Sequence, residues 1–403
     1  MKIYIPDYLQ DKIIDSNNRI CILGTINIDD GVTSVTDVIL ETDALQQRDD
    51  FETHNEAQPF WDRKLLTILD PDNQKSNGIF QIDPVERSKW FYRDTLIEDV
   101  IVYDTKEYFK RNPFDSTVLK SLERERILVV GLGSVGAKMG LELAKSGVGT
   151  FISVDKDIMK VHNAMRHPLG LPYMGWSKAK AFKQYLKEQA PNSDCIDICG
   201  DIFNGNNPEM LKYVFESLKP TRILALTDSL QVQYQCQELA IDYNLPFMAV
   251  ACDSHAVEGE IFIWEPGQAN QWKPGRPKRG CYGCLRDPNK TQLRSEHFEY
   301  GIDDPESSGP IPALGLYIER VTNIASIFTL AWILRDCETE TELGKLLNSY
   351  YEGKGLQYIR LGGPYSYDDD QKFQAENPWG VEWYRVSKNE DCVICGSDRV
   401  PRY

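Results

Sequence analysis

The residues best suited to chemistry begin at a glycine-rich turn. Gly131, Gly133 and Gly136 lie in the sequence GLGSVG, which follows the apolar run 127–130 and precedes a helical pattern. In this strand-to-helix context, glycines let a phosphate approach the backbone, and the helix N-terminus supplies free N–H groups. The next apolar run ends at Asp155, where a carboxylate can accept hydrogen bonds from a ribose. These residues alone are compatible with either a dinucleotide or a mononucleotide.

Charged residues downstream favour a nucleoside triphosphate. Asp157 and Asn163 are followed by Arg166, and then by Lys178 within the sequence GWSKA. A hydride-transfer site has no evident need for an arginine and a lysine beside the phosphates, whereas displacement at a triphosphate needs such charges. Asp228 comes just after a further apolar run, so we expect it at the carboxyl end of a strand, where a carboxylate can hold Mg²⁺.

Four of the ten cysteines form two CxxC pairs, Cys281-Tyr-Gly-Cys284 and Cys392-Val-Ile-Cys395. This spacing is typical of a tetrahedral Zn²⁺ site with four thiolates. Such a site has no open position for catalysis, so we expect a structural zinc that ties the C-terminal part of the chain back to the sheet.

These residues require a buried sheet to position them. Short apolar runs alternate with helical patterns, which predicts an α/β fold with a mostly parallel Rossmann-like sheet. A long apolar helix is expected over 313–335. Residues 1–115 instead alternate apolar and polar positions in short runs, which predicts a small N-terminal α+β domain for partner or substrate recognition.

Residues 116–403 are expected to form the second domain, which holds the nucleotide and zinc sites. Within it we expect two segments outside the main pattern, a crossover loop over 285–312 and a C-terminal insertion over 340–390.

Composition narrows the classes of partner. The 403 residues include 45 Lys and Arg against 61 Asp and Glu, which gives a net charge of −16 and argues against nucleic acid as a partner. No apolar run reaches the roughly 20 residues needed to span a bilayer. The N-terminus lacks the apolar segment of a signal peptide, and free cysteines suit a reducing compartment, so we expect a cytoplasmic protein.

The sequence resembles the ThiF/MoeB/HesA superfamily of ubiquitin-activating-type enzymes. The matching stretches are RILVVGLGSVGAKMGLELAKSGVG, VDKDIMKVHNAMRHP, MGWSKAKA, ALTDSLQVQYQ, GCYGCLRDP and EDCVICG. The resemblance extends over about 121–335 and 390–396. It implies ATP-dependent adenylation of the C-terminal carboxylate of a ubiquitin-like protein ending in glycine, in a prokaryotic-type conjugation or sulfur-transfer pathway.

The resemblance also implies residue roles. Arg166 and Lys178 would stabilise charge on the moving phosphates, Asp155 would hold the ribose, and Mg²⁺ would leave with pyrophosphate. Members are commonly dimers, so the resemblance implies a homodimer. Some members complete the site with a partner's arginine, and Arg111 lies near that position. Where the family has a glutamine this chain has His167, which can be a neutral structural histidine or a catalytic one. The nucleotide-binding set is Gly131, Gly133, Gly136, Asp155, Asp157, Asn163, Arg166, Lys178 and Asp228.

Thioester-forming relatives carry a cysteine after the first CxxC pair. The corresponding segment here, 305–312, holds Ser307 and Ser308 and no cysteine, so we expect direct transfer of the acyl-adenylate. Cys252, at the end of an expected strand, is the best remaining candidate for a nucleophile. A conjugating enzyme is a further partner that the resemblance implies. The alternatives are adenylation of a short peptide, as in microcin-maturing enzymes, an NAD-dependent oxidoreductase, or a scaffolding protein without activity.

Overall fold

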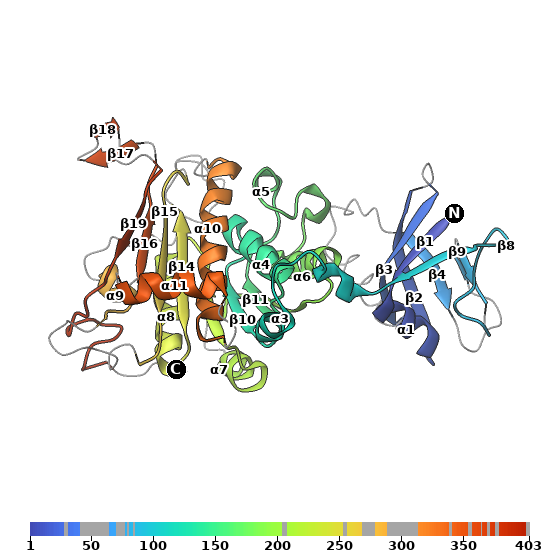
Figure 1. The fold of residues 1–403 in the computed structure, drawn as a ribbon, viewed down its shortest axis with the longest axis horizontal. Helices are drawn as coiled ribbons and strands as arrows, with labels where there is room; N and C mark the ends of the chain where they lie inside the picture. Colours follow the sequence, from blue (N-terminus) through green and yellow to red (C-terminus); the bar gives the residue numbers. More distant parts are fainter. Residues whose placement is uncertain are drawn as a thin grey trace. The chain divides into compact units, whose positions relative to one another are not determined.

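The computed structural model describes residues 1–27, 31–40, 64–69, 77–78, 80–83, 85–203, 208–252, 256–267, 279–287, 313–337, 341–353, 357–363, 365–368, 371–374 and 379–399. The chain divides into two compact units (Figure 1). Unit 1 comprises Met1–Pro113 and Leu171–Gly175, and unit 2 comprises Phe114–Gly170 and Trp176–Tyr403.

The main feature of unit 2 is an eight-stranded sheet with the order β12-β11-β10-β13-β14-β15-β16-β19. Its strands are β10 (Arg126–Val130), β11 (Thr150–Asp155), β12 (Asp194–Cys199), β13 (Arg222–Ala225), β14 (Phe247–Cys252), β15 (Gly259–Trp264), β16 (Tyr358–Leu361) and β19 (Val381–Tyr384). The first five strands in this order are parallel, and the last three join antiparallel. The expected α/β class with a largely parallel Rossmann-like sheet is therefore confirmed.

Strand register places the chemistry at one edge of the sheet. Val130 of β10 lies opposite Val154 of β11 and Ala225 of β13. Because parallel strands present their carboxyl ends at the same edge, the glycine-rich turn, Asp155 and the segment after β13 all emerge there. The antiparallel strand β15 starts at this edge, since its Gly259 lies opposite Cys252.

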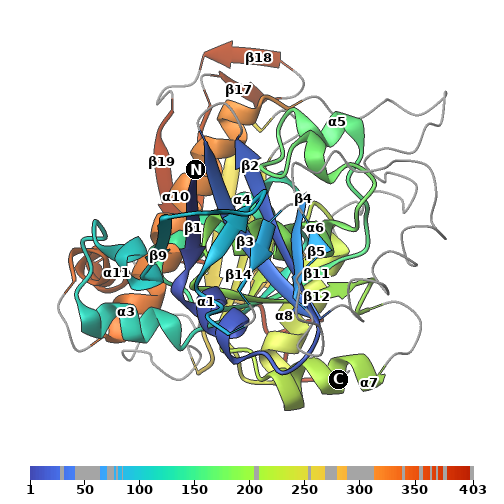
Figure 2. The same ribbon diagram turned by 90° about the vertical axis from the view of Figure 1, so that its right-hand side faces the viewer.

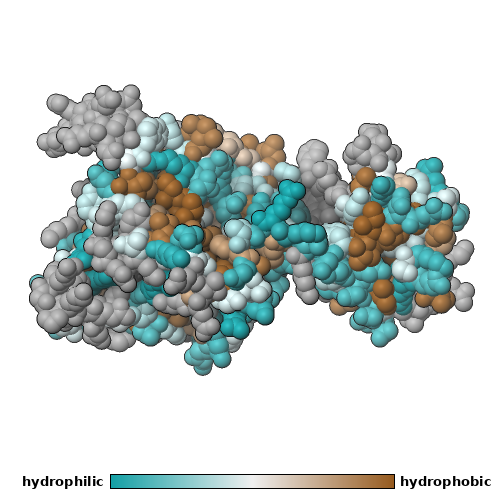
Figure 3. Space-filling view, in the orientation of Figure 1, coloured by the Kyte–Doolittle hydropathy of each residue, from teal (hydrophilic) through white to brown (hydrophobic). Residues whose placement is uncertain are grey.

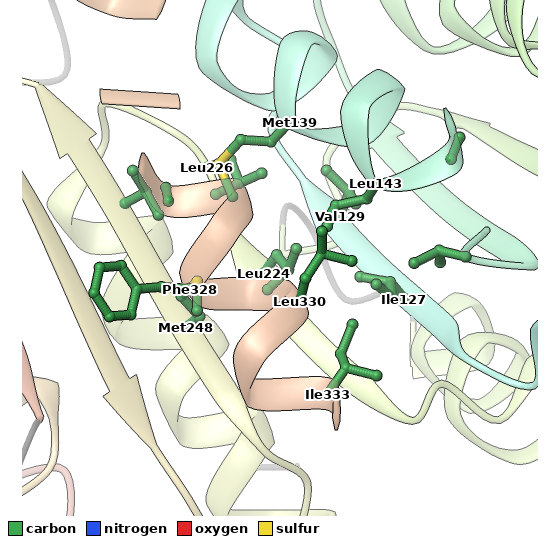
Figure 4. Close-up of a cluster of buried hydrophobic side chains, with 14 of the residues drawn as sticks. Ile127, Val129, Met139, Leu143, Leu224, Leu226, Met248, Phe328, Leu330 and Ile333 are labelled. Atoms are coloured by element: carbon green, nitrogen blue, oxygen red, sulfur yellow. The ribbon is translucent and has the colours of Figure 1, made fainter. Parts of the chain in front are cut away.

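Helices cover both faces of this sheet. They are α3 (Ser116–Glu123), α4 (Ser134–Ser146), α5 (Val161–Ala164), α6 (Lys178–Gln189), α7 (Pro208–Lys212), α8 (Leu230–Asp242), α9 (Tyr282–Leu285), α10 (Gly315–Ile333) and α11 (Glu342–Gly353). One face packs under α4 and α10, where Met139, Leu143 and Phe328 meet apolar side chains of the strands (Figure 4). On the other face, Cys236 and Leu239 of α8 belong to a second buried cluster. The long helix expected over 313–335 is α10, which buries most of its surface.

The C-terminal segments differ in part from the sequence reading. The segment 340–390, read as an insertion, contributes β16 and β19 to the central sheet, while β17 (Tyr365–Asp368) and β18 (Gln371–Gln374) form a separate two-stranded sheet. The strands β16 and β19 have four residues each, and so short a run shows too little hydrophobic periodicity to be recognised from the sequence alone. Most of the expected crossover loop, 288–312, lies outside the described residues, and so do Ser307 and Ser308.

Unit 1 contains a six-stranded sheet with the order β5-β4-β2-β3-β1-β9, seen in Figure 2. Its elements are β1 (Lys2–Pro6), α1 (Asp7–Asp15), β2 (Ile20–Asn27), β3 (Val32–Leu40), β4 (Lys64–Leu69), β5 (Asn77–Gly78) and β9 (Asp99–Tyr103), with β6 (Phe80–Ile82), β7 (Trp90–Tyr92) and β8 (Thr95–Leu96) in a small three-stranded sheet. Apolar positions that alternate along these strands form one core, which confirms the expected α+β character.

The surface of each unit is mixed in character. Apolar side chains are exposed in patches among hydrophilic ones (Figure 3). Within the described parts of the chain, no helix combines the length and the apolar composition that crossing a bilayer requires.

Candidate functional site

The three positions in the turn between β10 and α4 are occupied by glycine for different structural reasons. Gly131 has φ +96°, and a Cβ there would lie 2.8 Å from the carbonyl oxygen of Leu226. A Cβ on Gly136 would lie 2.0 Å from the carbonyl oxygen of Gly131, so only glycine fits. A Cβ on Gly133, which precedes the first turn of α4, would meet nothing within 4 Å. Gly133 therefore leaves open space at the helix N-terminus, where a phosphate can bind.

Side chains on either side hold the backbone of this turn. The Leu132 N–H donates to Asp155 Oδ2 at 2.6 Å, and the Leu132 carbonyl oxygen lies 2.8 Å from Nε2 of His167. The Leu169 N–H donates to Nδ1 of the same imidazole at 3.3 Å. Since Nδ1 accepts, the ring proton lies on Nε2 and donates to Leu132. The pKa of His167 falls to about 4, mainly because the ring is buried. His167 is thus a neutral structural histidine.

Asp155, Asp157 and Lys178 come together beside this turn. The Asp157 N–H donates to Asp155 Oδ1 at 2.8 Å, and Lys178 Nζ pairs with Asp157 Oδ2 at 2.8 Å. Burial raises the pKa of Asp155, while the positive charge of Lys178 opposes that rise. Lys178 begins α6 and is only 9% exposed. Its ammonium has three donors, so the pair with Asp157 leaves two for a further anion.

Asn163 and Arg166 belong to the short segment around α5. Asn163 Oδ1 accepts from the Lys160 N–H at 2.9 Å, so its side chain caps this helix. Arg166 is half-buried, and a Cβ on Gly315 at the start of α10 would lie 3.8 Å from its Cα. The turn therefore places Arg166 against α10.

Asp228 and Arg111 are both exposed. Asp228 follows β13 at the carboxyl edge of the sheet, and the preceding Leu226 contacts the glycine-rich turn. An exposed carboxylate at the edge of the sheet where the glycine-rich turn also lies offers the oxygen ligands that Mg²⁺ prefers. Arg111 belongs to unit 1, so the structure of unit 2 does not include it.

The four cysteines of the two CxxC pairs form a cluster in unit 2, which we call the cysteine knuckle. Their Sγ atoms all lie within 4.8 Å of one another, with 3.7 Å between Cys281 and Cys392 and 3.4 Å between Cys284 and Cys395. A tetrahedron with Zn–S bonds of about 2.3 Å has sulfur atoms about 3.8 Å apart. The donor set and its size therefore fit a metal ion. Among the described residues, no other group of three or more His, Cys, Asp or Glu side chains fits a metal.

Sequence reasoning missed two features near the site. Cys199, like Cys252, ends a strand at the ligand-facing edge; it is exposed and accepts from Ser177 Oγ at 3.0 Å. Gln233 is buried at the start of α8 and accepts a hydrogen bond from Tyr282, which lies between Cys281 and Cys284. Glutamines recur at 231, 233, 235 and 237, so no local spacing singles out Gln233.

Curated relatives match less than half of this chain. The chain is 35% identical over 195 residues to the uncharacterized protein y4qC of Sinorhizobium fredii, covering 46% of this chain and 31% of that protein. It is 28% identical over 167 residues to the adenylyltransferase and sulfurtransferase uba4 of Aspergillus terreus, covering 41% and 32%. The chain thus spans about a third of the length of the curated relatives it matches.

Among solved structures, the crystal structure of E. coli MccB with ATP is 15% identical, covers 70% of this chain and 68% of that chain, and has a TM-score of 0.47. The family model described as the ThiF family matches residues 108–357, which include the glycine-rich turn, Asp228 and the first cysteine pair. Because this match extends over more than half of the 403 residues, the chain belongs to the ThiF family.

Proposed function

We propose that this protein uses ATP to adenylate the C-terminal carboxylate of a ubiquitin-like protein, as an adenylyltransferase of the ubiquitin-activating type. The observation that carries the proposal is the meeting of the glycine-rich turn, Asp155 and Lys178 at one edge of the sheet. A relative named as an adenylyltransferase and sulfurtransferase supports the reaction class.

The binding step follows from the groups that remain available. Each oxygen of Asp155 already accepts one backbone N–H, which leaves lone pairs for ribose hydroxyls. The open space at Gly133 lets phosphate oxygens reach the N–H groups at the start of α4. Asn163, whose amide nitrogen is not needed for its cap, completes the proposed binding set.

In the chemical step, an oxygen of the substrate carboxylate bonds to the α-phosphorus of ATP. The bond from that phosphorus to the bridging oxygen breaks, and pyrophosphate leaves with the electron pair. Arg166 and Lys178 stabilise the charge that moves onto phosphate oxygens. Asp228 would hold Mg²⁺, which when bound would neutralise charge on the pyrophosphate. The product is an acyl-adenylate, whose acyl group passes directly to a nucleophilic acceptor while AMP leaves.

The cysteine knuckle and residues 1–115 have roles outside the chemical step. The knuckle holds a structural Zn²⁺, and its closed set of four thiolates assigns it no step in catalysis. Residues 1–115 recognise the substrate or a conjugating-enzyme partner, and a homodimer brings Arg111 to the partner's site. All ten cysteines lie in described segments and none forms a disulfide, which supports a cytoplasmic location.

Substrate-dependent ATP–pyrophosphate exchange tests the function, with candidate small proteins encoded nearby as substrates. Arg166→Ala and Asp228→Ala should each lower the exchange rate by about 10²-fold, the scale of one lost transition-state contact. Matched controls are Arg124→Ala and Asp194→Ala, because both residues are exposed near the opposite edge of the sheet and should leave exchange unchanged.

Two outcomes would redirect the proposal. Exchange within about twofold of wild type in both site variants would reject the assigned site, since one transition-state contact carries far more than that. Exchange supported by short peptides, but by none of the small proteins, would move the proposal to peptide adenylation.

A further inference from the structure

A chain of buried hydrogen bonds connects the cysteine knuckle with the turn that carries Asp228. Tyr282 lies between the two cysteines of the first pair and is 1% exposed. Its Oη donates to Gln233 Oε1 at 2.7 Å, and Gln233 Nε2 donates to the carbonyl oxygen of Thr227 at 2.7 Å. Gln233 is also 1% exposed, and its side chain connects Tyr282 with Thr227.

The bond to Thr227 acts directly on Asp228. The carbonyl of Thr227 and the amide nitrogen of Asp228 belong to one planar peptide group. A donor that restrains this carbonyl therefore also restrains the peptide plane that contains the Cα of Asp228. The Ser229 N–H adds a second restraint, because it donates to Thr227 Oγ1 at 3.2 Å. Asp228 is thus an exposed carboxylate on a backbone held from the buried side.

Residues 281–286, which contain the first cysteine pair, also form hydrogen bonds with helix α8 at two further points. The Tyr282 N–H donates to Gln237 Oε1 at 3.1 Å, one helical turn after Gln233, and Tyr234 Oη donates to the carbonyl oxygen of Arg286 at 2.8 Å. These bonds hold the first turns of α8 against residues 281–286. The donor Tyr282 and the acceptor Gln233 are therefore fixed by more than their own contact.

Glu260 offers Tyr282 a second acceptor, at 3.2 Å. The other oxygen of this carboxylate accepts from Arg286 and from Tyr358 Oη, the latter at 3.0 Å. A tyrosine has one hydroxyl proton, and the shorter distance assigns it to Gln233. Tyr358 thus shares the carboxylate of Glu260 with Tyr282 but has no bond to Gln233, which makes it a matched control.

We propose that Tyr282 and Gln233 are positioning residues for Asp228, so that the cysteine knuckle sets the orientation of the magnesium-binding carboxylate. This inference rests on the proposed function, because it takes Asp228 as the Mg²⁺ ligand. It assigns the knuckle an indirect role in the site besides its role in stability.

The test is ATP binding by equilibrium titration, with excess Mg²⁺ and separately with EDTA. Tyr282→Phe removes the hydroxyl alone and should weaken binding about fivefold with Mg²⁺, the scale of one hydrogen bond. With EDTA its affinity should equal that of wild type, because Asp228 then has no metal to hold. Tyr358→Phe should match wild type under both conditions.

Gln233→Leu provides a second variant that leaves residues 281–286 intact. It should show the same loss that depends on Mg²⁺, and combining it with Tyr282→Phe should add nothing, since both break one chain of bonds. Additive effects, equal losses with EDTA, or a loss in Tyr358→Phe as large as in Tyr282→Phe would overturn the proposal.

The wild type separates failure of this inference from failure of the proposed function. If Mg²⁺ does not strengthen ATP binding to the wild type, the assignment of Asp228 fails and the positioning role fails with it. If Mg²⁺ strengthens binding to the wild type and to both variants equally, only the positioning role is overturned.

Discussion

The glycine-rich turn and the cysteine knuckle fix their chain segments by different means. In the turn, Gly131 and Gly136 are near in sequence, and close packing of backbone on backbone defines the shape. Asp155 and His167 then hold both polar groups of Leu132. In the knuckle, the closest contacts join thiols 111 positions apart, from segments that an isolated antiparallel bridge between Arg279 and Ser387 also pairs.

This difference indicates how each region should fail. The turn depends on the absence of side chains and on one neutral imidazole, so an added methyl group or a proton disturbs it. The knuckle depends on a cross-link between distant segments, so loss of the metal or of one thiolate disturbs it. Perturbations can therefore be aimed at either region alone.

The largest expected effect comes from the knuckle. Purified protein should contain a single Zn²⁺ per chain, measured by elemental analysis. Cys281→Ser or Cys392→Ser should greatly reduce the yield of folded protein, because metal-binding free energies on the order of 10 kcal/mol are folding free energy at such sites. A chelator should likewise lower the thermal unfolding temperature of the wild type.

Cys199→Ser is the matched control, because this thiol is exposed and lies outside the knuckle. It should change neither metal content nor the unfolding temperature. Well-folded wild-type protein without metal would contradict the claim that a metal ion cross-links the two cysteine pairs.

The second effect is a pH dependence that originates at the turn. The imidazole of His167 has a pKa of about 4 in the folded protein against 6.5 for an ordinary histidine. As pH falls below 6.5 the unfolded chain takes up this proton first, so the free energy of unfolding should decrease by about 3 kcal/mol between pH 6.5 and 4. Above pH 6.5 this contribution is fully present. Urea unfolding at several pH values measures it.

His167→Gln isolates this titration from that of the carboxyl groups. A glutamine can donate to Leu132 and accept from Leu169 without taking up a proton in this range. Subtracting its pH profile from that of the wild type should leave the loss described above. A flat difference would show that His167 does not titrate as the structure indicates.

The third effect separates two glycines of the turn. Gly136→Ala should lower the free energy of unfolding by about 2 kcal/mol, since its methyl group would press on the carbonyl of Gly131. Gly133→Ala should leave stability unchanged but weaken ATP binding about tenfold, because its methyl group occupies the space proposed for a phosphate. Equal stability of the two variants would contradict the packing argument.

The smallest expected signal is a thioester. If the knuckle cysteines are structural and residues 305–312 contain no cysteine, the substrate should form little or no conjugate that a thiol reagent cleaves. Gel analysis with and without reducing agent measures this. A strong thiol-labile conjugate that disappears in Cys252→Ala, with adenylation retained, would show that this chain has a thioester site after all.

Much of the fold could be predicted because its signals are local. The run 127–130 is apolar throughout, as a strand buried on both faces requires, and the glycine spacing identifies the turn that follows. The strands β16 and β19 were not recognised. They have four residues each, and their place in the sheet depends on pairing with β15 rather than on their own pattern.

The sequence by itself determined the α/β class, the position of the glycine-rich turn and the pairing of cysteines into two CxxC units, because each is encoded within a few neighbouring residues. The tertiary structure alone decided that His167 is a neutral clamp on Leu132 and that Tyr282 reaches the turn of Asp228 through Gln233. The physical reason is that a buried polar group must find a partner, and for these side chains that partner lies on a different element, which no local spacing reveals.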